Sequence, residues 1–323
     1  MQLGDILVTM GPIFGIILCG FLAGHSKLLG SLGAKSLSGY VYYFALPALL
    51  FEATAQASLR DLTNWGFVMA SLAGIAVSFV CAFFLIRWLF HGSLLDATLD
   101  SMAAAYGNTG YMGVPLLSAA LGQSAVLPAT LAVLLHNVPV VTTVTVLAQC
   151  SQTARDPGQK AHLLKDVGKA IFGNPLNLAV IGGLSLASIH ISPPLGVMNF
   201  ARLLAGAAGP TGLFILGLSL APSPVLQKGI SSRHKEAALL VFFKIGLQPL
   251  VTCFFALAVF HITPLWASVT VLMAAMPIGA NVAIFAQKYD VYSPHISRAI
   301  LASTLLSLLF LPIGIILLKQ VLG

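Results

Sequence analysis

Charged side chains are scarce in this sequence. Asp, Glu, Lys and Arg make up 8% of the 323 residues, whereas soluble domains carry roughly 25%, so an ordinary soluble domain is excluded. The four cysteines form no CxxC pair and have no metal-ligand spacing, so we expect buried free thiols and neither a metal site nor a cofactor. No HExxH motif, paired aspartates or Ser–His arrangement stands out, and we expect no enzymatic activity.

What the sequence has instead is a series of long apolar stretches, in a chain that is 58% hydrophobic. Each is near the length of about 20 residues that a helix needs to cross a bilayer, and the short alternating strands of a membrane barrel are missing. We therefore predict an all-α membrane protein with ten transmembrane helices. The predicted spans are residues 5–24, 36–57, 65–88, 97–121, 125–149, 170–190, 196–220, 236–260, 265–288 and 296–319.

Basic residues are distributed unevenly between the predicted loops. With the N-terminus outside, twelve Lys and Arg residues face the cytoplasm, and two, Arg60 and Lys319, face the other side. By the positive-inside rule we predict a multi-pass membrane protein with both termini outside. The net charge of +7 then reflects topology rather than a nucleic-acid partner. The first apolar run lacks a preceding basic segment, so we expect a retained span rather than a cleaved signal.

Three prolines of the first half recur in the second half at separations of 163, 163 and 162 residues. The pairs are Pro12 and Pro175, Pro47 and Pro210, and Pro115 and Pro277. This spacing predicts an internal duplication: a first five-span repeat in 1–150, a cytoplasmic linker in 151–169 and a second five-span repeat in 170–323. Because five is odd, the second copy enters the membrane from the opposite side, which makes the repeat inverted.

Two stretches inside predicted spans 4 and 9 are too rich in glycine and proline to be helical throughout. They are Tyr106–Pro115 and Met276–Asn281. A broken helix exposes amide groups and a positive dipole end at the start of its second half, where Pro115 and Pro277 are expected. In an inverted repeat these ends can converge on one bound anion. A pair of ordinary proline kinks is the alternative.

The two breaks supply most of the predicted substrate-binding residues. These are Asn108, Thr109, Gly110, Tyr111, Gly113 and Pro115 in the first break, and Pro277, Ile278, Gly279 and Asn281 in the second.

Lys244 and Gln248 complete the predicted site. Lys244 lies nine residues beyond Lys235, about 13 Å along the helix, which is deep for a side chain that snorkels. A cationic side chain inside the membrane predicts one of two roles. Lys244 binds a carboxylate of the substrate, or its charge acts in place of a coupling ion. A structural lysine bonded to carbonyls freed near Pro249 is the alternative.

Other ionisable residues receive structural interpretations. Glu52 and Arg202 lie at similar depths in predicted spans 2 and 7, so we predict a structural ion pair. Asp96 and Asp100 are expected to be interfacial caps at the start of span 4, and His136 is expected to be a buried packing residue.

Several motifs together resemble the auxin efflux carrier family, and within it the bacterial malonate-carrier branch, which implies a protein of the bacterial cytoplasmic (inner) membrane. They are Gly107-Asn108-Thr109-Gly110, Gly113-Val114-Pro115, Met276-Pro277-Ile278-Gly279, Phe285-Ala286-Gln287-Lys288-Tyr289, Phe44-Ala45-Leu46-Pro47-Ala48-Leu49-Leu50-Phe51, and Lys244 with Gln248-Pro249.

The resemblance implies ten spans in two inverted repeats, with crossed broken helices in spans 4 and 9. It implies that spans 1, 2, 6 and 7 form a scaffold, often dimeric, against which spans 3–5 and 8–10 move in an elevator-like cycle. Asn108 occupies the family's substrate-binding asparagine position, and Pro115 and Pro277 occupy the crossover prolines. The long cytoplasmic loop of many plant members is missing here. Known substrates of the family are organic carboxylates.

The sequence therefore predicts a secondary transporter, or permease, for a small organic carboxylate anion such as malonate or a similar dicarboxylate. Alternating access of the elevator type is the expected mechanism; a homodimer and a coupling proton or sodium ion stay open. The alternative is a cation-coupled antiporter or a bile-acid-type sodium symporter of related fold. Antiporters of that architecture usually place an aspartate beside the helix crossing, and 102–121 and 265–288 contain no carboxylate. A channel is disfavoured because no filter-like motif repeats.

Overall fold

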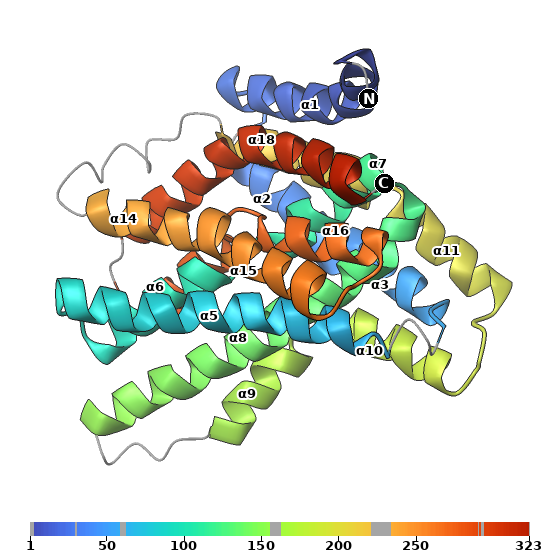
Figure 1. Ribbon diagram of the computed structural model, residues 1–323. Coiled ribbons are helices and arrows are strands. Elements are labelled where there is room, and N and C mark those ends of the chain that lie inside the picture. The colour runs from blue at the N-terminus through green and yellow to red at the C-terminus, as the bar shows by residue number, and fades with distance from the viewer. Residues whose placement is uncertain are drawn as a thin grey trace. The chain divides into compact units, whose positions relative to one another are not determined.

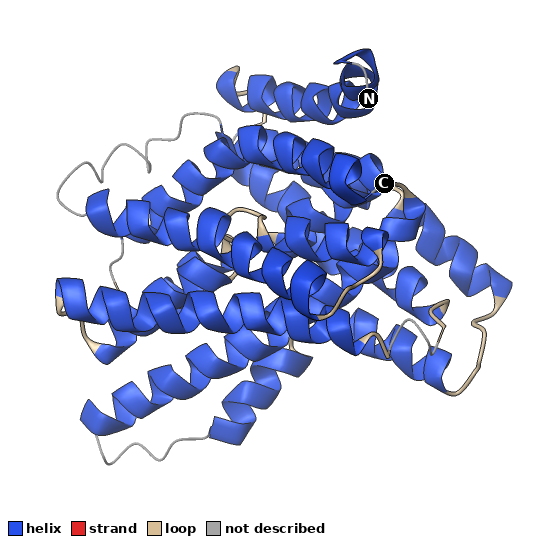
Figure 2. Ribbon diagram, in the orientation of Figure 1, coloured by secondary structure: helices blue, strands red, loops and turns tan. Residues whose placement is uncertain are grey.

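The computed structural model describes residues 3–29, 31–58, 63–155, 163–220, 234–289, 291 and 294–322. Every regular element in these ranges is helical (Figure 2), which confirms the all-helical prediction. Five stretches of the described chain are long and apolar enough to cross a membrane, in agreement with a membrane protein. They are Trp65–Phe90, Gln123–Ser151, Leu195–Leu218, His234–Val259 and His295–Leu322. Shorter apolar helices are Gly11–His25, Thr109–Leu121, Pro175–Ser188 and Pro264–Ala274.

The chain divides by its packing into two units, each built from three separate segments. Unit 1 comprises Met1–Asn64, Thr109–Val133 and Pro175–Pro224, and unit 2 comprises Trp65–Asn108, Leu134–Asn174 and Val225–Gly323. The boundary after Asn108 falls inside the first predicted break.

Unit 1 is held together by close helix pairs. Its helices are α1 (Leu3–His25), α2 (Ser31–Tyr40), η1 (Val41–Ala45), α3 (Leu46–Ala55), η2 (Thr109–Gly113), α7 (Val114–Leu121), η3 (Gln123–Ala125), the start of α8 (Val126–Arg155), α10 (Pro175–Ser188), α11 (Leu195–Ala205) and α12 (Ala208–Leu220). The tightest pair is α1 with α12. A Cβ atom on Gly20 would lie 2.0 Å from the Phe214 carbonyl oxygen, and one on Gly217 would lie 1.8 Å from that of Ile17. Only glycine allows these backbones to approach so closely.

Unit 2 contains most of the long apolar helices, and most of its helices are labelled in Figure 1. They are α5 (Trp65–Phe90), α6 (Leu94–Ala105), the rest of α8, α9 (Leu163–Phe172), α14 (His234–Val241), η4 (Phe242–Leu247), α15 (Gln248–Phe254), η5 (Phe255–Val259), α16 (Pro264–Ala274), α17 (Asn281–Lys288) and α18 (Pro294–Leu322). Its core joins α5, α6, α14 and α18 through fully buried apolar side chains such as Leu99, Met102 and Leu240.

Wide π-helical turns precede three prolines of the apolar helices. Pro47, Pro115 and Pro249 each stand in the first two positions of an α-helix that follows η1, η2 and η4, respectively. Proline lacks an amide hydrogen, and its ring clashes with the carbonyl of the residue four positions earlier. A wider turn before the proline relieves that clash within a continuous helix.

The predicted linker 151–169 is helical at both ends, because α8 continues to Arg155 and α9 begins at Leu163. Residues 156–162 lie outside the described residues, as do the predicted loop residues Arg60, Lys228 and Arg233. The division into two five-span repeats stays a prediction.

Candidate functional site

Both predicted breaks interrupt their helices, at residues 106–108 in the first and 276–280 in the second, and within unit 2 the two interruptions touch. Tyr106, directly after α6, is extended (φ −91°, ψ 111°), and six residues separate the end of α16 at Ala274 from the start of α17 at Asn281. Gly107 of the first break pairs with Ile278 of the second in an isolated antiparallel bridge. We call this pairing the crossing.

Two backbone hydrogen bonds hold the crossing together. The Asn108 amide donates to the Pro277 carbonyl at 2.8 Å, and the Gly279 amide donates to the Tyr106 carbonyl at 3.0 Å. Pro277 contributes only its carbonyl, so its missing N–H has no cost there. Pro115 stands at the start of α7 as expected. Pro277, in contrast, lies in the connection four residues before α17, because the intervening residues are used in the pairing.

Gly279 is required by the closeness of the two strands. A Cβ atom at this position would lie 2.7 Å from two ring carbons of Tyr106 and 3.1 Å from the Gly107 carbonyl oxygen. The amide of Ile278 donates to the Ser303 hydroxyl on α18 at 3.1 Å. The irregular backbone is therefore bonded inside protein, as it must be at membrane depth.

The Tyr106 hydroxyl links the crossing to two helices. It donates to the Asn137 side-chain oxygen on α8, and it accepts from Nδ2 of Asn281 on α17 at 2.8 Å. Asn137 is buried, with 3% of its surface exposed. The sequence predicts a binding role for Asn281 but not for Tyr106 or Asn137; the position of the polar Asn137 within an apolar run is the signal that could have identified it.

Asn108 presents its side chain at the crossing. The residue is half-buried, and its carboxamide has no hydrogen bond to any part of the chain that the structure describes. Its backbone amide is used in the crossing, so the side chain retains two donors and an acceptor. The arrangement fixes the backbone while leaving the carboxamide available to a ligand.

Lys244 is fully buried in η4. Its ammonium donates to the carbonyl of Ala274, the last residue of α16, and none of the described carboxylates pairs with it. The helix ends here, so the Ala274 carbonyl has no partner within α16. A structural role for Lys244, bonded to a freed carbonyl, is therefore supported, but the carbonyl belongs to the second break and does not lie near Pro249. When protonated, the Lys244 amine has three donors, and its charge then favours an anionic partner.

Gln248 lies one turn after Lys244, on the same helix face. Its Nε2 is 3.4 Å from Nε2 of His136 on α8. The side-chain oxygen of Gln248 is buried and has no hydrogen-bond partner among the described residues. Lys244 and Gln248 therefore add polar groups to the interior of unit 2, and His136 is buried against one of them.

The remaining site candidates from the first break pack inside unit 1. Thr109, Gly110 and Gly113 are buried in η2. Tyr111 stacks on Tyr42, with ring centroids 6.0 Å apart and ring planes 9° from parallel. Pro115 packs against α12. The structure thus groups Asn108 with Pro277, Ile278, Gly279 and Asn281 in unit 2, and the residues from Thr109 to Pro115 in unit 1.

Glu52 and Arg202 form an ion pair in unit 1, with Arg202 Nε 2.9 Å from Glu52 Oε1. About half of the Arg202 side chain is exposed (52%). An exposed pair of this kind contributes about 0–1 kcal/mol to stability, so it links α3 to α11 and adds little to the stability of the whole fold.

Comparisons with known proteins place these features in context. Residues 5–315 match a family described as membrane transport protein. The chain is 31% identical over 299 residues to a Rhizobium meliloti (strain 1021) protein named "Putative malonate transporter", covering 92% of this chain and 90% of that protein. It is 24% identical over 297 residues to the uncharacterized transporter YfdV of Escherichia coli (strain K12), covering 90% and 89%. It is 26% identical over 324 residues to the lysosomal cholesterol signaling protein of Mus musculus, covering 95% of this chain and 37% of that protein.

Proposed function

Since the chain belongs to the membrane transport protein family, we propose that it carries a small organic carboxylate, malonate or a similar dicarboxylate, across the membrane by alternating access. The family membership confirms the resemblance to the auxin efflux carriers, and it makes the chain an integral multi-pass transporter rather than an enzyme.

The crossing is the observation that supports this proposal most directly. Two interrupted helices pair through the backbones of Gly107 and Ile278, and interrupted helices at membrane depth are where secondary transporters bind substrate. Asn108 presents an unbonded carboxamide at this point. A pair of simple proline kinks would not require such backbone pairing between distant segments.

The polar groups near the crossing suit an anion with carboxylate groups. Lys244 supplies a buried positive charge, and the side-chain amides of Asn108, Gln248 and Asn281 supply neutral donors. A charged donor with several neutral donors can hold one carboxylate firmly and a second by hydrogen bonds. The name of the Rhizobium meliloti relative supports malonate as the first substrate to test.

We also propose the finer architecture that the sequence predicts: ten spans in two inverted repeats, with both termini outside the bacterial cytoplasmic membrane. The two units support an elevator mechanism, because predicted spans 1, 2, 6 and 7 fall in unit 1 and most of spans 3, 8, 9 and 10 fall in unit 2. Residues 109–133, which the resemblance assigns to the moving part, have their contacts within unit 1. We therefore propose unit 2 as the moving part, with unit 1 as the scaffold and dimer surface.

A cation-coupled antiporter or bile-acid-type sodium symporter is the rival function. It receives no support from the breaks, because 102–121 and 265–288 contain no carboxylate to hold a cation beside the crossing.

Uptake of labelled malonate into proteoliposomes tests the proposal, with imposed proton or sodium gradients to identify a coupling ion. We expect the wild-type chain to accumulate malonate or a related dicarboxylate, and Asn108→Ala to abolish uptake while the protein stays folded. Asn199→Ala, at an exposed position of α11, is the matched control and should behave as wild type. Full uptake by Asn108→Ala, or no carboxylate uptake by the wild type, would overturn the proposed function.

A further inference from the structure

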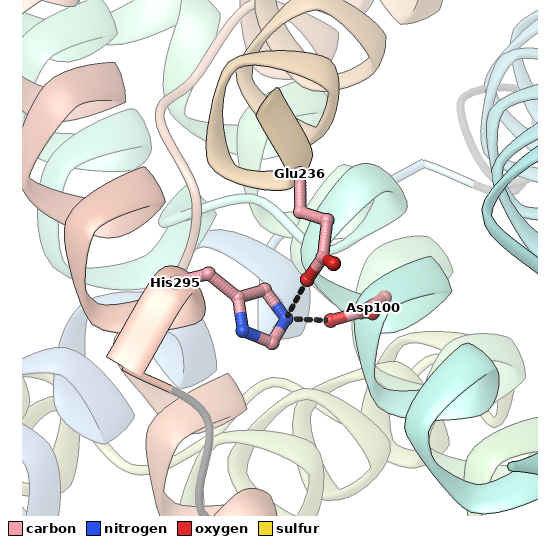
Figure 3. A group of neighbouring side chains, drawn as sticks. All are labelled: Asp100, Glu236 and His295. Carbon is pink, nitrogen blue, oxygen red and sulfur yellow. Dashed lines mark hydrogen bonds and ion pairs between the residues drawn. The ribbon is translucent and has the colours of Figure 1, made fainter. Parts of the chain in front are cut away.

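Three ionisable side chains from distant parts of the sequence meet inside unit 2, and none of them belongs to the crossing. Asp100 lies in α6, Glu236 in the first turn of α14 and His295 in the first turn of α18. These three helices pack against one another. Figure 3 shows the three side chains pointing to a common centre. We call this group the triad.

Both carboxylates of the triad approach the same nitrogen atom. Nε2 of His295 lies 2.6 Å from Asp100 Oδ1 and 3.7 Å from Glu236 Oε2 (Figure 3). One ligand atom from each residue lies within 4.8 Å of the other two. The side chains are 4%, 7% and 2% exposed for Asp100, Glu236 and His295, respectively. A single imidazole nitrogen carries at most one proton, so it cannot serve two carboxylates equally.

A cation at the common centre satisfies all three groups at once. We propose that the triad is a binding site for a divalent first-row transition-metal ion, which fastens α6, α14 and α18 together. Metal bonds to His and to carboxylate are about 2.0–2.2 Å long, so neighbouring ligand atoms at 90–110° lie about 2.8–3.6 Å apart. The two separations from His295 Nε2, 2.6 and 3.7 Å, bracket this range, and the ligand atoms of the two carboxylates lie within 4.8 Å of each other.

Charge also favours a divalent ion. Two ionised carboxylates and a neutral imidazole carry two negative charges, and buried charges require compensation. Glu236 stands in the first turn of α14, where the positive end of the helix dipole favours negative charge, and a metal ligand carboxylate is deprotonated. Arg298 follows His295 by one turn, but neither of its terminal nitrogens has a hydrogen-bond partner among the described residues, so it does not neutralise the carboxylates by direct bonding.

The ligand types select the kind of ion. Mg²⁺ and Ca²⁺ take oxygen ligands, whereas an imidazole nitrogen combined with carboxylates suits ions such as Mn²⁺ and Zn²⁺. Three protein ligands leave coordination positions for water. The proposal concerns packing within unit 2 and does not depend on which anion is transported.

Titration of the purified full chain in detergent with Mn²⁺ tests the proposal, with free Mn²⁺ followed by its EPR signal after chelator treatment. We expect one Mn²⁺ per chain, displaced by Zn²⁺. Asp100→Asn, Glu236→Gln and His295→Asn should each weaken binding by at least about tenfold. Asp96→Asn and His91→Asn are the matched controls. Asp96 lies one turn before Asp100 and bonds to Ser93, and His91 is exposed; both variants should bind as wild type.

A measurement on the wild type alone decides the case if a triad variant fails to fold. Mn²⁺ ligated by His295 should show coupling to an imidazole nitrogen in pulsed EPR spectra. Absence of that coupling, absence of binding of either metal at millimolar concentration, or unchanged binding in all three folded variants would overturn the proposal. None of these results would bear on malonate uptake, so the metal site and the proposed function fail separately.

Discussion

Replacing Tyr106 by phenylalanine removes one oxygen atom beside the crossing and leaves the ring in place. The hydroxyl donates to the Asn137 side-chain oxygen and accepts from Asn281 Nδ2 at 2.8 Å. The ring contact with Gly279 does not involve this oxygen. The substitution therefore removes both hydrogen bonds of the hydroxyl and leaves the packing volume at Gly279 unchanged.

The expected loss follows from the burial of the two amides. Hydrogen bonds between membrane helices contribute about 0.6 kcal/mol on average and at most about 1.7 kcal/mol. Asn137 is 3% exposed, so its oxygen loses its partner without gaining water, whereas half-buried Asn281 can be partly rehydrated. We expect the loss of both hydrogen bonds to lower the free energy of unfolding by about 1–2 kcal/mol in total. If the same free energy is lost from the conformation that binds substrate, uptake decreases about five- to thirtyfold.

The assay combines the melting temperature of the purified protein with labelled malonate uptake at equal protein density. Tyr43→Phe is the matched control, because Tyr43 is 62% exposed and should tolerate the change. The double variant Tyr106→Phe with Asn281→Ala should lose less stability than the sum of the losses in the two single variants. Wild-type melting temperature and uptake in Tyr106→Phe, or strict additivity in the double variant, would refute the argument.

Three further predictions concern other parts of the molecule. Lys244→Met should abolish uptake while the protein stays folded, because it removes the buried positive charge beside the break but keeps most of the side-chain volume. Gly279→Ala should destabilise the protein by about 1–3 kcal/mol and lower uptake, because the new methyl group meets the Tyr106 ring at 2.7 Å. Glu52→Gln and Arg202→Ala should show a small but non-zero coupling energy of about 0.2–1 kcal/mol in melting experiments, with uptake largely retained.

Each of these predictions has a control or a contrary result. Lys235→Met, at an exposed position of α14, should transport normally, and equal uptake in Lys244→Met would remove the charge-pairing role. Gly182→Ala meets no atom within 4 Å and should be neutral; a neutral Gly279→Ala would contradict the close approach at the crossing. Strictly additive losses for Glu52 and Arg202 would count against their pairing.

The breaks could be located from sequence because glycine and proline act locally. Pro115 and Gly279 restrict or free their own backbone whatever packs around them, so their clustering in two apolar stretches predicts interruptions there. The same reasoning does not predict which distant residues these residues contact in the folded protein. Pro277 was expected in the first turn of a helix, but its carbonyl is used by Asn108 from another segment, and only the folded chain brings the two together.

Residues that depend on long-range contacts were missed or misjudged for the same reason. Asp96 bonds to Ser93 three residues away, as a helix cap does, and its role is readable from sequence. Asp100 was expected to be a second cap, yet it is buried against His295, 195 positions later in the chain. The sequence alone offers no spacing rule that relates Asp100, Glu236 and His295, and for this reason it predicts no metal site.

The crossing is made of peptide groups rather than side chains, and this affects how the protein can change over time. The hydrogen bonds between Tyr106, Asn108, Pro277 and Gly279 use backbone atoms, which most substitutions leave in place. Nearby side chains can therefore be exchanged without dismantling the framework that presents them. Relatives with this framework are thus free to diverge in cargo preference through a few substitutions, and cargo cannot be inferred from conservation of the framework alone.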